Sequence, residues 1–297
     1  YIAPQTWASR QWRNRRIARD VTRLACILPF EPSYFQARGV TQAEFVGHPL
    51  FESLEREQPN PDTLRRLRDD DKPLIALLPG SRRHVIETML PLQLRVLSHL
   101  HAIGTSFRVA VSAVDEQRRD TVARTLDRWN QSHGATAGSN SPSPSASRRA
   151  APPFEAEIAT ADNAALLTAA HLVLVASGTA TLHVAHYRKP MIVMYDAGRV
   201  LRLPHRLFGR FVVRTPHLSL VNILAGARVV PEFMPFIRDT RPIARVAEQL
   251  LSDATWRGLM IRQIDDVVAP LETSRASHRV CEIATELLNG PFAANAS

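Results

Sequence analysis

Cysteine and long apolar runs are scarce in this chain. Its 297 residues include only two cysteines, Cys26 and Cys281, which lack the close spacing of a zinc site and exclude a multi-disulfide scaffold. We expect free thiols in a reducing cytosol. No apolar run approaches the ~20 residues that a membrane-spanning helix needs. The composition, 45% hydrophobic and 22% charged, is that of a globular protein with one large or two medium domains.

The chain also has no initiator methionine and no signal-peptide pattern at its start. Its first residues, Tyr1-Ile2-Ala3-Pro4, are typical of the end of a strand that runs into a loop. We therefore expect the chain to begin inside a domain, with part of an N-terminal domain missing.

Positive charge dominates: 37 Lys and Arg face 28 Asp and Glu, for a net charge of +9. Most of the cations are arginines, whose planar guanidinium suits phosphate groups. Nucleic acid, an anionic membrane and a phosphorylated substrate are all compatible with this charge. We find no RNA- or DNA-binding motif, so nucleic acid is not an expected partner.

Two strand–turn–helix segments have the pattern of a phosphate site. The apolar run LVLVA (172–176) predicts a buried strand, which Ser177-Gly178-Thr179 connects to a helix. The run LIALL (74–78) predicts another, followed by Pro79-Gly80-Ser81-Arg82 and a second helix. Helix N-termini offer unpaired N–H donors at the carboxyl edge of a parallel sheet, where phosphates bind. We expect both turns to hold one phosphate-bearing ligand.

Alternating strands and helices predict an α/β fold with a parallel sheet. Residues 1–50 are interpreted as the C-terminal part of an N-terminal Rossmann-like domain, and the polar stretch 51–72 as a linker. Residues 73–240 form a nucleotide-binding domain, interrupted by a disordered, Ser/Pro-rich insertion at 131–153. Residues 241–297 are predicted to be C-terminal helices.

Two basic, aromatic segments, 7–23 and 199–214, are candidates for contact with an anionic membrane, with Trp7 and Trp12 as interfacial anchors. An ordinary solvated helix face explains the first segment equally well, and a short surface helix on the core is the preferred interpretation of the second. The run LSLVNILAG (218–226) reads as a strand that contains the polar residue Asn222.

Several segments in order resemble the lipid-A-disaccharide synthase family, glycosyltransferase family 19. The resemblance covers nearly the whole chain apart from the insertion, and it implies a GT-B fold. Such a fold has two Rossmann-like domains with parallel sheets, of which the N-terminal one would be incomplete here. The segments that carry it are YIAPQTWASRQWR, ILPFEPSYF, FVGHPL, LLPGSR, LVLVASGTATL, KPMIVMY and SLVNILAG.

The resemblance implies an inverting transfer of 2,3-diacylglucosamine from its UDP conjugate to 2,3-diacylglucosamine 1-phosphate (lipid X), with release of UDP. It implies no metal ion and no cofactor besides the UDP-sugar donor. It further implies a peripheral location at the cytoplasmic face of the inner membrane, against an anionic lipid surface. A homodimer is left open.

Without a metal ion, donors from the protein must stabilise the departing diphosphate. The two turns supply them, and the resemblance adds two nucleotide-binding candidates, His183 and Asn222. The family usually has a glutamate at position 183 and an acidic residue at position 85, where this chain has Val85. A neutral histidine is a weaker, pH-dependent acceptor for ribose. The predicted binding residues are Gly80, Ser81, Arg82, Ser177, Gly178, Thr179, His183 and Asn222.

The acceptor hydroxyl needs a base, which the resemblance places upstream of Tyr1. Within the chain only His48 is a candidate, and a linker histidine fixed by the following proline is the simpler interpretation. Two other functions stay open. One is a different GT-B enzyme of UDP-sugars, such as another glycosyltransferase or a UDP-N-acetylglucosamine 2-epimerase. The other is a non-catalytic paralogue that binds nucleotide or membrane.

Overall fold

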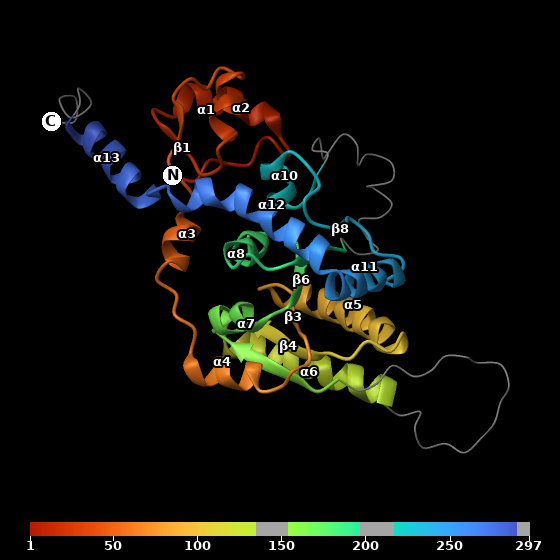
Figure 1. The fold of residues 1–297 in the computed structure, drawn as a ribbon. Coiled ribbons are helices and arrows are strands. Elements are labelled where there is room, and N and C mark those ends of the chain that lie inside the picture. The colour runs from red at the N-terminus through yellow and green to blue at the C-terminus, as the bar shows by residue number, and fades with distance from the viewer. Residues whose placement is uncertain (135–153, 197–216, 290–297) are drawn as a thin grey trace, which may run out of the picture.

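The computed structural model describes residues 1–134, 154–196 and 217–289. The segment 199–214, predicted to contact a membrane, lies outside the described residues, as does the insertion from residue 135 on. The described residues form two parallel sheets (Figure 1). The smaller sheet pairs β1 (Leu24–Cys26) with β2 (Ala43–Phe45).

The larger sheet has six parallel strands in the order β5-β4-β3-β6-β7-β8. Numbered along the chain, this is the 3-2-1-4-5-6 order of a dinucleotide-binding fold, and its topological switch point lies between β3 and β6. Ligands bind outside the carboxyl ends of the strands at such a point. The strands are β3 (Leu74–Leu78), β4 (Arg108–Ala113), β5 (Ala156–Thr160), β6 (Leu172–Ala176), β7 (Met191–Met194) and β8 (Glu232–Phe233).

Helices cover both faces of this sheet because right-handed crossovers run in opposite directions from the switch point. On one face α5 packs against α6 and α11, and on the other α7 packs on α4 while α8 packs on α3 and α12. All residues of β3, β6 and β7 are buried, as expected for strands covered twice. The helices are α3 (Pro49–Leu54), α4 (Pro61–Arg68), α5 (Arg83–Ala102), α6 (Glu116–Gly134), α7 (Asn163–Ala169), α8 (Ala180–His186), α11 (Arg241–Ser252) and α12 (Ala254–Glu272).

Capping residues begin several of these helices. Asp115 accepts from the Arg118 N–H before α6, and Asp162 accepts from the Ala165 N–H before α7. Residues 218–226, in contrast, were predicted to be a strand and are not. They contain the helix α10 (Leu220–Ala225), because the Ser219 hydroxyl caps its first turn and Gly226 ends it with a φ of 61°.

The small sheet packs with α1 (Asn14–Asp20) and α2 (Glu31–Gln36) around its own core, and η1 (Gln11–Arg13) precedes α1 without a buried residue. The prediction that Trp7 is a surface anchor is wrong. Its indole is 7% exposed and donates to the buried Glu31 carboxylate at 3.0 Å. Trp12 is 65% exposed, as a surface residue should be.

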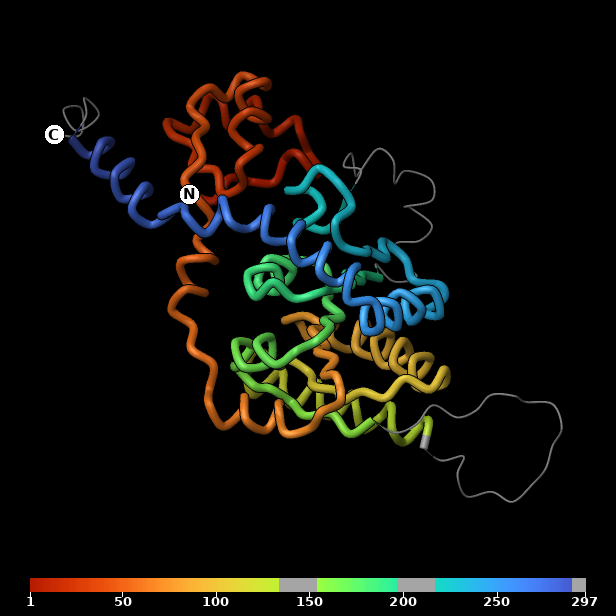
Figure 2. Tube along the Cα trace, in the orientation of Figure 1, coloured from red at the N-terminus to blue at the C-terminus, as the bar shows by residue number. Residues whose placement is uncertain are grey.

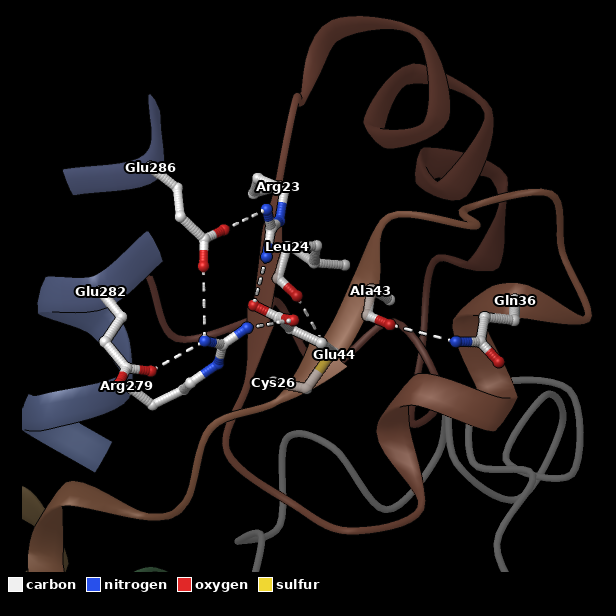
Figure 3. Close-up of polar contacts among 9 residues, drawn as sticks. All are labelled: Arg23, Leu24, Cys26, Gln36, Ala43, Glu44, Arg279, Glu282 and Glu286. Carbon is white, nitrogen blue, oxygen red and sulfur yellow. Dashed lines mark hydrogen bonds and ion pairs between the residues drawn. The ribbon is translucent and has the colours of Figure 1, made fainter. Parts of the chain in front are cut away.

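Helix α13 (Ala276–Asn289) returns to the small sheet, so the last described helix lies beside the first segments of the chain, while its C-terminal end points away from them (Figures 1 and 2). Ile283 packs against Ala25 and Val46. Around this contact, arginines and glutamates from both segments alternate, as Figure 3 shows. Arg23 bonds to Glu44 at 2.9 Å and Glu286 at 2.8 Å, while Arg279 bonds to Glu44 at 3.1 Å and Glu282 at 2.8 Å.

Candidate functional site

A cavity of about 450 Å³ opens at the switch point, where both predicted turns meet. Seven of the eight predicted binding residues line it, and Asn222 does not. The two turns are brought together because β3 and β6 are paired neighbours, with Leu77 opposite Leu174. The complete lining is Leu50, Leu78, Gly80, Ser81, Arg82, Val85, Ser112, Val114, Asn163, Ala176, Ser177, Gly178, Thr179, Ala180 and His183.

The turn after β3 requires a glycine. Gly80 has a φ of +115°, and a Cβ atom there would lie 2.8 Å from the Cγ1 atom of Val85. The next residues, Ser81 and Arg82, are exposed to the cavity. The Arg118 guanidinium donates to the Ser81 carbonyl at 3.1 Å and so holds the turn from α6.

Arg82 lies directly before α5 and adds a positive charge to its N-terminus. Among the ion pairs of the described residues none includes Arg82, whereas the neighbouring Arg83 pairs with Glu87 at 3.0 Å. The lining of the cavity contains no aspartate or glutamate from the described part of the chain. A guanidinium beside two helix N-termini, with no acid facing it, suits an anionic ligand.

The turn after β6 has Gly178 at a φ of +147°. The Ser177 N–H donates to the Met194 carbonyl at 3.0 Å, which extends the sheet to the start of the turn. The Thr181 hydroxyl donates to the Gly178 carbonyl at 2.8 Å and fixes the turn from within α8. The Thr179 side chain makes no capping hydrogen bond of its own and lines the cavity.

His183 lies one helical turn after Thr179 on α8. Its Nε2 atom is 3.1 Å from Glu57 Oε2, and the Tyr187 hydroxyl donates to the same oxygen at 3.4 Å. Burial lowers the pKa of the His183 imidazole below its ordinary value, and the Glu57 carboxylate opposes that shift. The imidazole at the cavity therefore favours the neutral form near pH 7.

Asn222 lies elsewhere, fully buried at 0% exposure. Its Oδ1 accepts from the N–H groups of Val229 and Val230, both at 2.9 Å. Its Nδ2 donates to the Val230 carbonyl at 2.9 Å and to Glu232 Oε2 at 3.1 Å. These bonds occupy the whole amide, which holds α10 against the loop before β8.

His48, the candidate base, is also a structural residue here. Its Nδ1 accepts from the Leu50 N–H at 3.2 Å and caps α3, and its ring meets Phe51 edge-on. Burial lowers the pKa of His48. Leu50 lines the cavity while His48 does not, so the histidine shapes one wall without reaching the ligand space.

The sequence reasoning missed Ser112 and Asn163. The Ser112 hydroxyl donates to Asn163 Oδ1 at 2.6 Å, and both side chains line the cavity. Ser112 lies near the end of β4, and polar residues at the carboxyl ends of parallel strands meet at one edge. That position was the available signal. No feature of the sequence indicated that Glu57, in the predicted linker, lies close to the site.

A larger cavity of about 930 Å³ lies at the opposite end of the strands, near Lys72, Leu74 and Arg108. It faces the amino ends of β3 and β4, away from the switch point and from both turns. We therefore place the functional site at the smaller cavity. No group of three or more metal-ligating side chains occurs within the described residues. Within the same ranges, no helix has the length and apolar character needed to cross a membrane.

Comparisons with known proteins agree with the resemblance. The model of a family described as lipid-A-disaccharide synthetase matches residues 1–281. Lipid-A-disaccharide synthase of Anaeromyxobacter dehalogenans (strain 2CP-1) is 33% identical over 285 residues, which are 95% of this chain and 67% of the relative. The synthase of Myxococcus xanthus is 31% identical over 293 residues, covering 97% of this chain and 68% of the relative.

Two solved structures share the fold. A glycosyltransferase from Rickettsia africae aligns with a TM-score of 0.52 at 8% identity, covering 98% of this chain and 69% of that protein. The MnaA–UDP structure of S. aureus aligns with a TM-score of 0.51 at 12% identity, covering 89% of this chain and 61% of that protein. The α/β architecture with parallel sheets is of the GT-B type, as the sequence predicts.

Proposed function

Since the chain belongs to the lipid-A-disaccharide synthetase family, we propose that it transfers 2,3-diacylglucosamine from UDP-2,3-diacylglucosamine to lipid X and releases UDP. The observation that carries this proposal is the convergence of two glycine turns on one cavity, with Arg82 exposed to it. The cavity would hold the diphosphate of the donor. The reaction consumes two molecules, the UDP-sugar donor and the acceptor lipid X.

The chemistry follows from the charge of the leaving group. Breaking the bond between the sugar and the diphosphate places negative charge on the departing phosphate oxygen. The N-termini of α5 and α8 and the Arg82 guanidinium stabilise that charge, and the Thr179 hydroxyl adds a donor. One preorganised donor of this kind lowers the barrier by about 3 kcal/mol.

The acceptor hydroxyl must lose a proton to a base. With its Nδ1 occupied by the Leu50 N–H, His48 is poorly placed for this role. We therefore propose that a residue other than His48 serves as the base.

Two measurements test the function. UDP should raise the melting temperature of the protein, because a ligand that binds only the folded state stabilises it. The protein should convert UDP-2,3-diacylglucosamine and lipid X to the disaccharide 1-phosphate, and should not convert unacylated UDP-N-acetylglucosamine. If UDP does not raise the melting temperature, the cavity is not a UDP-binding site. A UDP shift without disaccharide would show a nucleotide-binding protein that does not turn over.

The exposed surface of η1 and α1 is proposed to contact the anionic lipid at the cytoplasmic face of the inner membrane. Trp12 projects there among arginines that include Arg13 and Arg16. Exposed aromatic and basic groups together favour binding at a lipid headgroup surface.

Trp12→Ala should weaken co-sedimentation with vesicles containing phosphatidylglycerol by severalfold, because the ring no longer enters the interface. The matched control is Leu259→Ala, which removes an exposed apolar side chain from α12. Binding should also fall as salt rises, since exposed charges are screened. Equal binding by wild type and Trp12→Ala would contradict the membrane surface.

A further inference from the structure

A cavity of about 250 Å³ lies in the groove between α5 and α6, which pack side by side (Figure 1). Arg95 lines it from α5, and Arg128, Trp129 and His133 line it from one face of α6. Arg95 follows Arg82 by 13 positions, or about 20 Å along α5. The groove is therefore separate from the cavity at the switch point.

The indole N–H of Trp129 has no hydrogen-bond partner among the described residues, although the nitrogen is closed off from bulk water. The residue as a whole is 5% exposed. Trp7 is buried to a similar degree, yet its N–H donates to Glu31 at 3.0 Å. Buried indole nitrogens ordinarily have such a partner. The N–H of Trp129 is thus a donor without an acceptor, on a side chain that lines the cavity.

Positive charge exceeds negative charge around this cavity. Arg95 is exposed and takes part in no ion pair of the described residues. Arg128 is 3.9 Å from Glu87, an acid that also lines the cavity. Glu87 lies closer to Arg83, at 3.0 Å, which is outside the cavity. Two guanidinium groups therefore line the cavity beside a carboxylate that a third arginine engages, and this excess suits a further anion.

The indole is held in place by its neighbours on α6. His133 packs flat on the Trp129 ring, with ring centroids 3.9 Å apart and an angle of 17° between the planes. Its Nδ1 atom is 2.9 Å from the Trp129 carbonyl oxygen and 2.8 Å from the Ser132 hydroxyl. Because these contacts fix both rings, the N–H is a preorganised donor, and an acceptor that reaches it does not have to order the side chain first.

We propose that the groove between α5 and α6 binds a small oxyanion, either inorganic phosphate or the phosphate group of a small phosphorylated molecule. Its oxygens lie between Arg95 and Arg128 and accept from the Trp129 N–H at the inner end of the cavity. The two sources share the same chemistry, since both present several acceptor oxygens and negative charge. The inference is independent of the proposed function, because none of these residues lines the cavity at the switch point.

The indole N–H signals in a ¹H–¹⁵N spectrum locate the ligand. Titration with inorganic phosphate at constant ionic strength should move the Trp129 signal, which Trp129→Phe identifies by its loss. The Trp7 signal should stay in place, because its N–H is already bonded to Glu31. A Trp129 signal that stays in place throughout the titrations with phosphate and glycerol 3-phosphate overturns the inference. Tighter binding of glycerol 3-phosphate identifies an esterified ligand, and equal or tighter binding of phosphate identifies the free ion.

Arg95→Ala should weaken phosphate binding at the Trp129 signal about 3- to 10-fold, since it removes an exposed charged donor. The matched control is Arg119→Ala, which removes an exposed arginine of α6 that pairs with Glu116 at 3.9 Å and lies outside the cavity. Equal affinities of the two variants would show attraction by general positive charge and would overturn the site.

Arg82→Ala separates this groove from the cavity at the switch point. Phosphate should still move the Trp129 signal of Arg82→Ala with the affinity of the wild type, because Arg82 does not line the groove. A response that disappears in Arg82→Ala and persists in Arg95→Ala would place the phosphate at the switch point and contradict the inference. Failure of UDP to bind would refute the proposed function and would leave this result unchanged.

Discussion

Arg82→Ala is expected to lower the affinity for UDP by roughly 10- to 100-fold, because a hydrogen bond to a charged group contributes about 1.5 to 3 kcal/mol. The effect should be confined to binding. Arg82 is exposed and takes part in no ion pair of the described residues, so the melting temperature of the ligand-free variant should match that of the wild type. Calorimetric titration measures the affinity for UDP, and a thermal scan measures the melting temperature of the ligand-free variant.

The neighbouring arginine provides the control. Arg83→Ala removes the same charge one residue later, from a side chain that pairs with Glu87 and does not line the cavity. Its affinity for UDP should stay within about threefold of the wild type. Arg82→Lys should recover part of the loss, since it keeps the charge without the planar fork. Equal losses for Arg82→Ala and Arg83→Ala would show that general positive charge, and not this position, attracts the ligand.

Gly80→Ala is expected to destabilise the protein by roughly 2 to 5 kcal/mol and to abolish UDP binding. The φ of +115° is strained for any residue with a Cβ, and the new atom would lie 2.8 Å from Val85 Cγ1. Both the strain and the clash act on the turn that carries Arg82. Chemical denaturation gives the free energy of unfolding and titration gives the affinity.

Two further variants separate strain from clash. Gly104→Ala has a φ of +89° but no atom within 4 Å of the new Cβ, so it should cost only the strain, about 1 to 3 kcal/mol. The double variant Gly80→Ala/Val85→Ala removes the clash, so it should be less destabilised than the sum of the two single variants. Strict additivity would mean that Val85 does not limit the turn.

The two turns could be predicted from the sequence because their information is local. A buried β-branched run predicts a strand, and a glycine between that strand and a helix predicts a close backbone approach. The carboxyl ends of parallel strands share an edge, so Gly80 and Gly178 were expected at the same site. The strand order that makes β3 and β6 neighbours was needed to confirm it.

Contacts between distant segments could not be predicted in this way. The sequence around Asn222 does not indicate that the loop before β8 forms hydrogen bonds with the Asn222 side-chain amide. Likewise, Glu57 reads as part of a polar linker, and only the packing of α3 against α8 brings it to His183. Residues 220–225 are apolar enough for a strand, but they form a helix because the Ser219 hydroxyl caps its first turn.

The return of α13 to the small sheet has a consequence for biosynthesis. Arg23 and Glu286 form one ion pair yet stand 263 positions apart. At about 5 to 20 residues per second, a ribosome needs roughly 13 to 50 s to travel between them. During that interval the β1–β2 pair has no α13 beside it, because α13 (Ala276–Asn289) is made only after the whole six-stranded sheet.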